Sequence, residues 1–467
     1  MAARFDPAAS RRRFCCTWTI GLVPLLVLAS IAWSQEAESA AQRDARIDRL
    51  IQQLDDDKFE VREKAEKELA AIGEAARTKL LTACQDGPFE RRERAAKLLR
   101  EIRRAGVGLR HVATTTHEGL AGAVTLVISP DGRFVYVPGF QSNAINVFRR
   151  DPLTGTLDVQ QTLVDPAQLR GVVTVRLSRD GKYAVAAAYA SKTITLLSRN
   201  AATGELKIES VRQHEPAGEL KLMWPIDAIF STDGKFGYAV DDQGATVVVF
   251  AVERGNKLRL VETFEGQERC FDGARGLIAH PDGKTLYVCS RRPGTLTVLD
   301  RAPATGKLSV RQILKDGEEG VSGLAGATEP RVSRDGKFVY TISGRFEGDN
   351  AIGIYRVNDD GRLQMIQELF PGQGEFENFA GANDLTLSPD ESLFYASGTT
   401  SCSLACFRRD AVSGKLTYLA TLQSEATGAG MDLGANGLEC SPDGRFLYLT
   451  VENARAISVF ERAQAPP

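Results

Sequence analysis

Seven side chains of this sequence are the best candidates for chemistry, and they are carboxylates, guanidiniums and amides. A carboxylate can take a proton as a general base, and a guanidinium can stabilise an oxyanion. The candidate catalytic residues are therefore Asp227, Arg275, Glu329, Arg331 and Asp384. A ring of carboxylate and amide oxygens can instead hold Ca²⁺ as a cofactor. The candidate metal ligands are Asp227, Glu329, Asn383, Asp384 and Asn436.

These candidates share a position relative to a recurring phrase. The phrase first appears as Ser129-Pro130-Asp131-Gly132 and returns six times, at spacings of 49, 53, 49, 53, 55 and 53 residues. All the candidates except Arg331 lie four or five residues before the first residue of a copy. Since equal offsets in a cyclic repeat map to the same depth, we expect them to converge on one mouth of a central channel.

The phrase itself has the composition of a tight turn between two strands. Asp-Gly between β-rich runs supplies the positive φ of a hairpin, so the flanking strands are adjacent and antiparallel. A third strand such as residues 247–250 follows, and a Gly-x-Leu turn such as Gly204-Glu205-Leu206 opens a fourth. Four strands in each of seven repeats predict a mainly β fold, a seven-bladed β-propeller over residues 108–463.

The seventh repeat lacks a fourth strand. After Phe460 only seven residues remain, without a Gly-x-Leu turn. An unpaired strand edge is a liability, and residues 109–115 have strand character. We expect this N-terminal segment to pair beside residues 457–460 and close the ring.

A helical segment precedes the propeller. Residues 41–104 carry apolar side chains at helical spacings with charges between them, and the pattern around Leu50, Leu69 and Ile72 returns thirty residues later at Leu80, Leu99 and Ile102. This predicts two helical hairpins that resemble HEAT-type repeats. Such a segment is either a spacer or a docking surface for a protein partner, and the channel mouth is the other candidate surface for a partner.

The N-terminus has the features of an export signal. Arg11-Arg12-Arg13 precede an apolar run from Ile20 to Trp33, which predicts a secretory signal peptide at residues 1–34. The protein is then extracytoplasmic, periplasmic or secreted, with no membrane span after cleavage; an uncleaved N-terminal membrane anchor is the alternative. A net charge of −2 gives no sign of a nucleic-acid partner.

The turn phrases, together with the hairpins at residues 148–157 and 407–416, resemble the lactonase-type seven-bladed propellers, the 6-phosphogluconolactonase and carboxymuconate cyclase relatives. The resemblance covers residues 108 to 463. It implies hydrolysis of a sugar lactone, with Arg275 or Arg331 at the oxyanion and Asp227, Glu329 or Asp384 as base. The family's channel histidines have no counterpart here, since none of His111, His117, His214 and His280 is predicted at the channel.

Three hypotheses about function follow. The first is a non-catalytic propeller that binds a protein or glycan at one mouth; the alternative is a sugar-lactone hydrolase, and a redox propeller ranks last because no haem or cofactor motif occurs. Three acids against one arginine at the predicted channel positions favour a cation or a neutral polyhydroxyl ligand. A phosphorylated lactone is therefore expected to be a poor substrate.

Overall fold

The structure is a computed structural model that describes residues 40–463 except 216, 268, 347 and 424–433. The predicted signal peptide, residues 1–34, lies outside the described residues. None of the described helices has the length and apolar character needed to cross a membrane.

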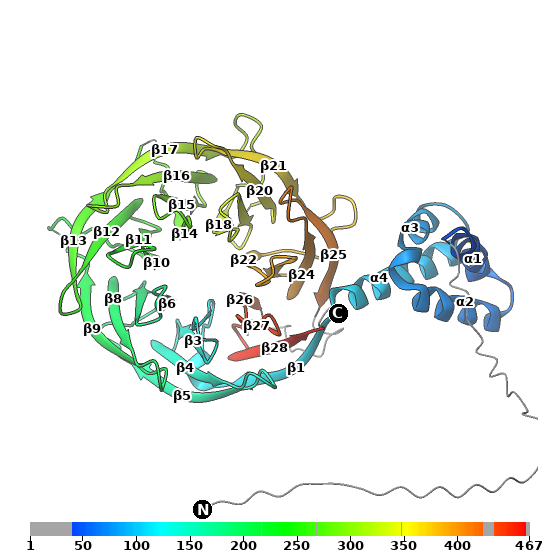
Figure 1. Cartoon of the computed structure of the whole chain (residues 1–467), viewed down its shortest axis with the longest axis horizontal. Helices are drawn as coiled ribbons and strands as arrows, with labels where there is room; N and C mark the ends of the chain where they lie inside the picture. Colours follow the sequence, from blue (N-terminus) through cyan, green and yellow to red (C-terminus); the bar gives the residue numbers. More distant parts are fainter. Residues whose placement is uncertain (1–39, 216, 268, 347, 424–433, 464–467) are drawn as a thin grey trace, which may run out of the picture.

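The strands form seven four-stranded antiparallel sheets arranged as a ring around a central channel (Figure 1). The fold is the predicted mainly β, seven-bladed propeller. Blades 1 to 3 contain β2 (Val127–Ile128), β3 (Phe134–Gly139), β4 (Ala144–Arg150), β5 (Leu157–Val164); β6 (Val172–Leu177), β7 (Tyr183–Ala188), β8 (Thr193–Arg199), β9 (Leu206–Gln213); and β10 (Pro225–Phe230), β11 (Phe236–Asp241), β12 (Thr246–Glu253), β13 (Lys257–Phe264).

Blades 4 to 6 repeat this order, with the first strand of each blade innermost. They contain β14 (Ala274–Ala279), β15 (Thr285–Ser290), β16 (Thr295–Arg301), β17 (Leu308–Lys315); β18 (Ala327–Val332), β19 (Phe338–Ser343), β20 (Ile352–Val357), β21 (Leu363–Leu369); and β22 (Ala382–Leu387), β23 (Leu393–Gly398), β24 (Ser403–Arg409), β25 (Leu416–Gln423).

Blade 7 is closed by both ends of the propeller sequence. It consists of β26 (Ala435–Cys440), β27 (Phe446–Val451), β28 (Ala456–Arg462) and β1 (Leu109–Thr116), in the order β1-β28-β27-β26. His111 pairs with Phe460 and Thr115 with Ile457 in an antiparallel ladder. The predicted closure by the N-terminal strand is confirmed.

The Gly-x-Leu turns hold neighbouring blades together. Gly204, in the turn between β8 and β9, has φ +77°, and a Cβ there would lie 2.3 Å from the ring of Phe134 in blade 1. The Tyr136 hydroxyl of blade 1 donates a hydrogen bond to the Gly204 carbonyl at 2.9 Å. The glycine therefore serves two purposes, since it permits the left-handed backbone and leaves room for the neighbouring ring.

The N-terminal segment forms two helical hairpins, as predicted. Its helices are α1 (Ala40–Gln52), α2 (Phe59–Ile72), α3 (Arg77–Gln85) and α4 (Phe89–Val107), with short 3₁₀ turns at Gln53–Asp55 and Gly73–Ala76. Five of the six predicted core residues are buried, and Ile72 is partly buried against the same core. The core is small and lies within the segment.

The helical segment sits beside blade 6 (Figure 1). Val107, at the end of α4, is buried in one cluster with Leu419 and Leu422 of β25. An ion pair of 2.5 Å joins Arg77 of the helical segment to Glu375, which lies between β21 and β22. The two parts therefore share a contact away from the channel.

Gly204→Ala tests how much the turn between blades contributes to stability. We expect it to lower the melting temperature more than Gly255→Ala, because Gly255 has the same φ of +77° but no atom lies within 4 Å of the place that its Cβ would occupy. Both variants carry the backbone strain, of order 1 kcal/mol or more, and only Gly204→Ala adds the collision with Phe134. Equal melting temperatures for the two variants would contradict the packing role.

Candidate functional site

The starts of the inner strands surround one cavity at a mouth of the channel. The cavity is open to solvent, and its space for water-sized molecules is about 40 Å³. Five of the predicted site residues line it, from blades 3 to 6, and two do not. The residues at the cavity are Asp227, Arg275, Glu329, Asn383 and Asp384; Arg331 and Asn436 lie outside its lining.

One wall of the cavity is apolar and the other is charged. Val124, Val173 and Ile226, from blades 1 to 3, form a buried cluster. The threonines of this region tie neighbouring inner strands together, since the Thr174 hydroxyl donates to the Ile226 carbonyl at 3.1 Å. Most of the charged lining residues come from blades 3 to 6, on the opposite wall of the cavity.

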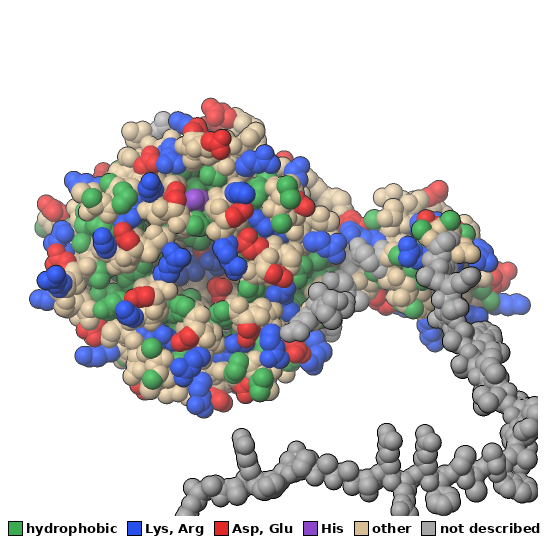
Figure 2. All heavy atoms as spheres, viewed as in Figure 1, with side chains coloured by type: hydrophobic (Ala, Val, Ile, Leu, Met, Phe, Trp, Pro, Cys, Tyr) green, Lys and Arg blue, Asp and Glu red, His purple; other side chains and the backbone are tan. Residues whose placement is uncertain are grey.

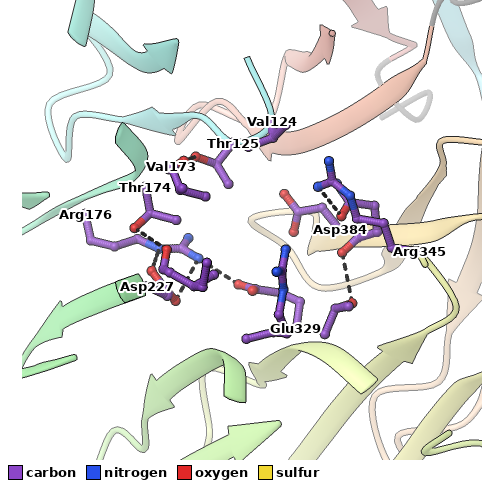
Figure 3. Close-up of a pocket in the computed structure, with 13 residues that line it drawn as sticks. Val124, Thr125, Val173, Thr174, Arg176, Asp227, Glu329, Arg345 and Asp384 are labelled. Carbon is purple, nitrogen blue, oxygen red and sulfur yellow. Dashed lines mark hydrogen bonds and ion pairs between the residues drawn. The ribbon is translucent and has the colours of Figure 1, made fainter. Parts of the chain in front are cut away.

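Arg176 joins two of the candidate carboxylates (Figure 3). It lies on β6, and its Nε donates to Asp227 Oδ1 at 3.2 Å while its Nη2 donates to Glu329 Oε1 at 2.8 Å. Asp227 also accepts from the backbone N–H of Ala228 at 2.9 Å and is 1% exposed. Asp227 is thus a positioning residue, whose oxygens are occupied by Arg176 and the backbone.

Glu329 is the carboxylate best suited to act as a base. Burial raises its pKa to about 7, and the charges of Asp227 and Asp384 act in the same direction while Arg176 opposes them. Its Oε2 lies beside Gly276, where a Cβ would come within 2.7 Å of it. Glycine at position 276 therefore gives this carboxylate room, and a carboxyl group with a pKa near 7 is matched to proton transfer at neutral pH.

Asp384 and Arg331 form a second group next to Glu329. Asp384 accepts from the backbone N–H groups of Leu385 at 2.7 Å and Leu438 at 2.9 Å. Arg331 donates to the Leu385 carbonyl at 3.0 Å and lies 3.5 Å from Asp384 and 3.9 Å from Glu329. Arg331 therefore supplies positive charge near both carboxylates from outside the cavity lining.

Arg345, from the connection between β19 and β20, reaches the cavity from above the asparagines. Its Nη1 donates to Asn383 Oδ1 at 2.8 Å, and its Nη2 lies 3.5 Å from Glu452. Asn383 in turn donates to Asn436 Oδ1 at 3.0 Å. Burial and the positive charge of Arg275 lower the pKa of Arg345 to about 10.

Four arginines of blades 4 and 5, which we call the arginine rim, lie together at this mouth: Arg275, Arg291, Arg292 and Arg345. Three of them share the buried carboxylate of Asp242, at 3.1, 3.4 and 3.1 Å. The guanidiniums of Arg275, Arg291 and Arg345 also surround the ring of Phe346, at 4.7, 5.3 and 5.1 Å from its centroid. Burial lowers the pKa of Arg275, and the charge of Arg291 acts in the same direction while Asp242 opposes both.

The rim changes the charge expected at the cavity. Counting only equal offsets gave three acids against one arginine, but Arg176 and Arg345 also line the cavity. The lining therefore holds three acids and three arginines, and the preference for a cation or a neutral polyhydroxyl ligand stays a prediction. In Figure 2, Lys and Arg side chains border the central hollow of the ring.

The five proposed calcium ligands already have other partners. Asp227 is paired with Arg176, and Asn383 and Asn436 bond to each other. Among the described residues no three His, Cys, Asp or Glu side chains are grouped so that they could hold a metal ion. Calcium binding stays a prediction, and it would require Arg176 and Arg331 to release their carboxylates.

Two kinds of site residue were missed from the sequence. Arg176, which lines the cavity, lies two residues beyond Thr174, so strand alternation places it on the same face, and that signal could have found it. By the same spacing Glu439 follows Gly437, outside the cavity lining. Burial raises the pKa of Glu439, with Arg331 opposing. Arg345 stands in a connection without periodicity, and no signal in the sequence marked it.

The fold and this site define a class of protein: seven-bladed propellers with a charged small-molecule cavity at the channel mouth. A model of the family described as "Lactonase, 7-bladed beta-propeller" matches residues 103–218, 166–426 and 347–466. The chain therefore belongs to the seven-bladed lactonase family.

Similar proteins agree with this assignment. The chain is 25% identical over 148 residues to a 6-phosphogluconolactonase of Bacillus subtilis, covering 32% of this chain and 40% of that protein. The match spans less than half the length of this curated relative. Among solved structures, the periplasmic gluconolactonase PpgL of Pseudomonas aeruginosa superimposes with a TM-score of 0.53 at 22% identity, covering 64% of this chain and 85% of that one.

A protein from Lactobacillus plantarum superimposes with a TM-score of 0.55 at 21% identity, over 64% of this chain and 84% of that one. At such identities the two solved structures show the shared fold.

Arg176→Met tests whether the buried ion pairs hold the inner strands. We expect it to lower the free energy of unfolding by about 3 kcal/mol, because Asp227 and Glu329 would lose their shared cation in a largely buried position. Lys182→Met is the matched control, since Lys182 pairs with Asp180 at 3.5 Å with both side chains exposed. The control should change the unfolding free energy by less than about 1 kcal/mol in urea titration. Similar losses in both variants would contradict the role of Arg176.

Proposed function

We propose that the protein hydrolyses a sugar lactone that carries an anionic group, at the cavity of the channel mouth. The observation that carries this proposal is Glu329, a buried carboxyl group with a pKa near 7 beside an arginine-rich rim. Membership of the lactonase family and the names of the 6-phosphogluconolactonase relatives support the reaction class.

In the proposed reaction Glu329 takes a proton from water as that water attacks the lactone carbonyl carbon. The carbonyl oxygen becomes an oxyanion, for which Arg345 or Arg275 supplies positive charge. The ring ester C–O bond then breaks, and the leaving alkoxide takes the proton back from Glu329. The net change is addition of one water to give a hydroxy acid, which is a carboxylate at neutral pH.

The arginine rim supports an anionic substituent on the lactone. Burial lowers the pKa values of Arg275 and Arg345. Three arginines of the rim share the single carboxylate of Asp242. Guanidiniums bind phosphate and carboxylate oxygens through paired N–H groups. The rim therefore supports a lactone such as 6-phosphogluconolactone as the substrate, and the sequence-based preference for a cation or a neutral polyhydroxyl ligand is the alternative.

Several sequence-based hypotheses stay predictions beside this proposal. The prediction of export rests on the charged and apolar pattern of residues 1–34. A protein partner at the helical segment, or a purely binding role for the propeller, would be favoured if no lactone is turned over. Assay of the full chain with and without a chelator would also test the calcium hypothesis.

Glu329→Gln tests the identity of the base. The carboxylate form takes the proton and predominates above the pKa, so kcat/KM should fall as the pH drops through about 7; an unperturbed glutamate would place that fall near pH 4.5. Glu329→Gln should lower kcat about 100-fold or more and abolish this dependence. The measurement is lactone hydrolysis corrected for the spontaneous reaction, and Glu118→Gln, at an 89% exposed side chain, is the control. A Glu329→Gln enzyme with the parental rate would exclude this base.

Arg275→Met tests recognition of the anion. We expect KM for 6-phosphogluconolactone to rise roughly tenfold or more, since a hydrogen bond to a charged group contributes about 1.5–3 kcal/mol. KM for unphosphorylated gluconolactone should change little, and Arg275→Lys should recover part of the loss. Arg254→Met, at an exposed position, is the control. Equal increases in KM for both lactones would show that Arg275 does not bind the phosphate group.

A further inference from the structure

Three aromatic side chains form a row at the channel mouth, in blades 1 to 3, and the row ends next to the arginine rim, since the Asp242 N–H donates to the Trp224 carbonyl at 3.0 Å. Phe140 follows β3 in blade 1, Tyr189 follows β7 in blade 2, and Trp224 precedes β10 in blade 3. The ring centroids of Phe140 and Tyr189 are 5.9 Å apart, and those of Tyr189 and Trp224 are 5.1 Å apart. We call these three residues the aromatic row.

The aromatic row is continuous with the cavity. Tyr189 packs against the buried cluster of Val124, Val173 and Ile226, and these three residues line the cavity. Phe140 is 37% exposed, and Tyr189 and Trp224 are partly exposed. The apolar wall of the cavity therefore extends outward over three blades.

The backbone beside each ring is fixed by hydrogen bonds. The Trp224 N–H donates to Asp241 Oδ2 at 2.9 Å, the Tyr189 N–H to the Gly171 carbonyl at 2.9 Å, and the Phe140 N–H to the Gly122 carbonyl at 3.2 Å. The row is thus a preorganised surface, and a ligand would lose little affinity to ordering it.

The chemistry of this surface fits a pyranose ring. A pyranose presents C–H groups on its face and hydroxyls around its edge, so it can stack on an aromatic ring while its hydroxyls stay in water. The three rings carry no charge. The nearby cations of blade 2 have other partners, since Arg170 donates to the Ala190 carbonyl at 3.0 Å and Arg176 pairs with Asp227 and Glu329. The row therefore favours a neutral ligand group.

We propose that the aromatic row binds a neutral sugar unit attached to the lactone, so that the substrate is a glycosylated aldonolactone longer than one ring. This inference rests on the proposed hydrolase function for the lactone end. The lactone occupies the cavity near Glu329, and the attached pyranose lies outward on Tyr189 and Trp224.

The test uses aldonates, which are the stable products, and therefore does not depend on turnover. Trp224 is the only tryptophan outside residues 1–34, because the other two are Trp18 and Trp33. Full-length protein with Trp18→Phe and Trp33→Phe reports on Trp224 alone by fluorescence. Cellobionate, which is gluconate carrying a linked glucose, should change this emission saturably and bind at least about tenfold more tightly than gluconate, a gain that stacking on two rings can supply.

Variants separate the row from the cavity. By calorimetry, Tyr189→Ala and Trp224→Ala should remove the preference for cellobionate and leave gluconate affinity unchanged, while Phe59→Ala, at a 61% exposed phenylalanine of the helical segment, should change neither. Equal affinity for the two aldonates, or equal weakening of both in the variants, would overturn the proposal. If the protein hydrolyses gluconolactone but shows no preference for cellobionate, the proposed sugar binding by the aromatic row is wrong and the hydrolase function stands. If it prefers cellobionate but hydrolyses no lactone, the proposed hydrolase function is wrong and the sugar binding stands.

Discussion

The structure depends on a hydrogen-bonded clasp between neighbouring blades. In the clasp of blades 1 and 2, the Tyr136 hydroxyl accepts from Arg199 Nε at 2.5 Å and donates to the Gly204 carbonyl at 2.9 Å. Arg199 also reaches Asp131, in the turn phrase of blade 1, at 3.0 Å. Arg150 with Tyr448, Arg301 with Tyr238 and Arg409 with Tyr340 repeat the arrangement at three further junctions. The buried hydroxyl is satisfied as donor and acceptor, and so fixes the angle between blades at little cost.

Of the three remaining junctions, that of blades 6 and 7 keeps the arginine, since Arg462 lies 3.7 Å from Asp390, and two use other contacts. Val252 and Val357 take the place of the arginine, since their N–H groups make the same backbone bond as that of Arg199. There, the Tyr183 hydroxyl donates to Asn256 at 2.8 Å, and the His280 ring lies 2.9 Å from the Gly336 carbonyl. The ring thus combines repeated clasps with two junctions of different contacts. These two junctions lie on either side of blades 3 and 4, which carry Asp227 and Arg275.

Much of the fold could be predicted because each blade repeats the same local physics. The Asp-Gly turns, the Gly-x-Leu turns and the missing final strand determine strand order and closure without knowledge of side-chain contacts. The channel positions followed from equal offsets, which placed Asp227, Glu329 and Asp384 at one cavity. The pairing of charges could not be predicted in this way, because Arg345 comes from an irregular connection and the pKa of Glu329 depends on burial by neighbouring blades. Such information resides in tertiary contacts between distant residues.

The closing strand also bears on how the molecule reaches its native state. The strand β1 pairs with β28, so Leu109 meets Arg462 only after the six intervening blades are in place. Contacts of such long sequence separation form slowly, because the entropy of closing the loop is lost before the contacts compensate for it. During folding, β28 exposes an unpaired edge until β1 arrives. The final step is therefore the one most vulnerable to self-association, and the rate of ring closure sets how long that vulnerable species persists.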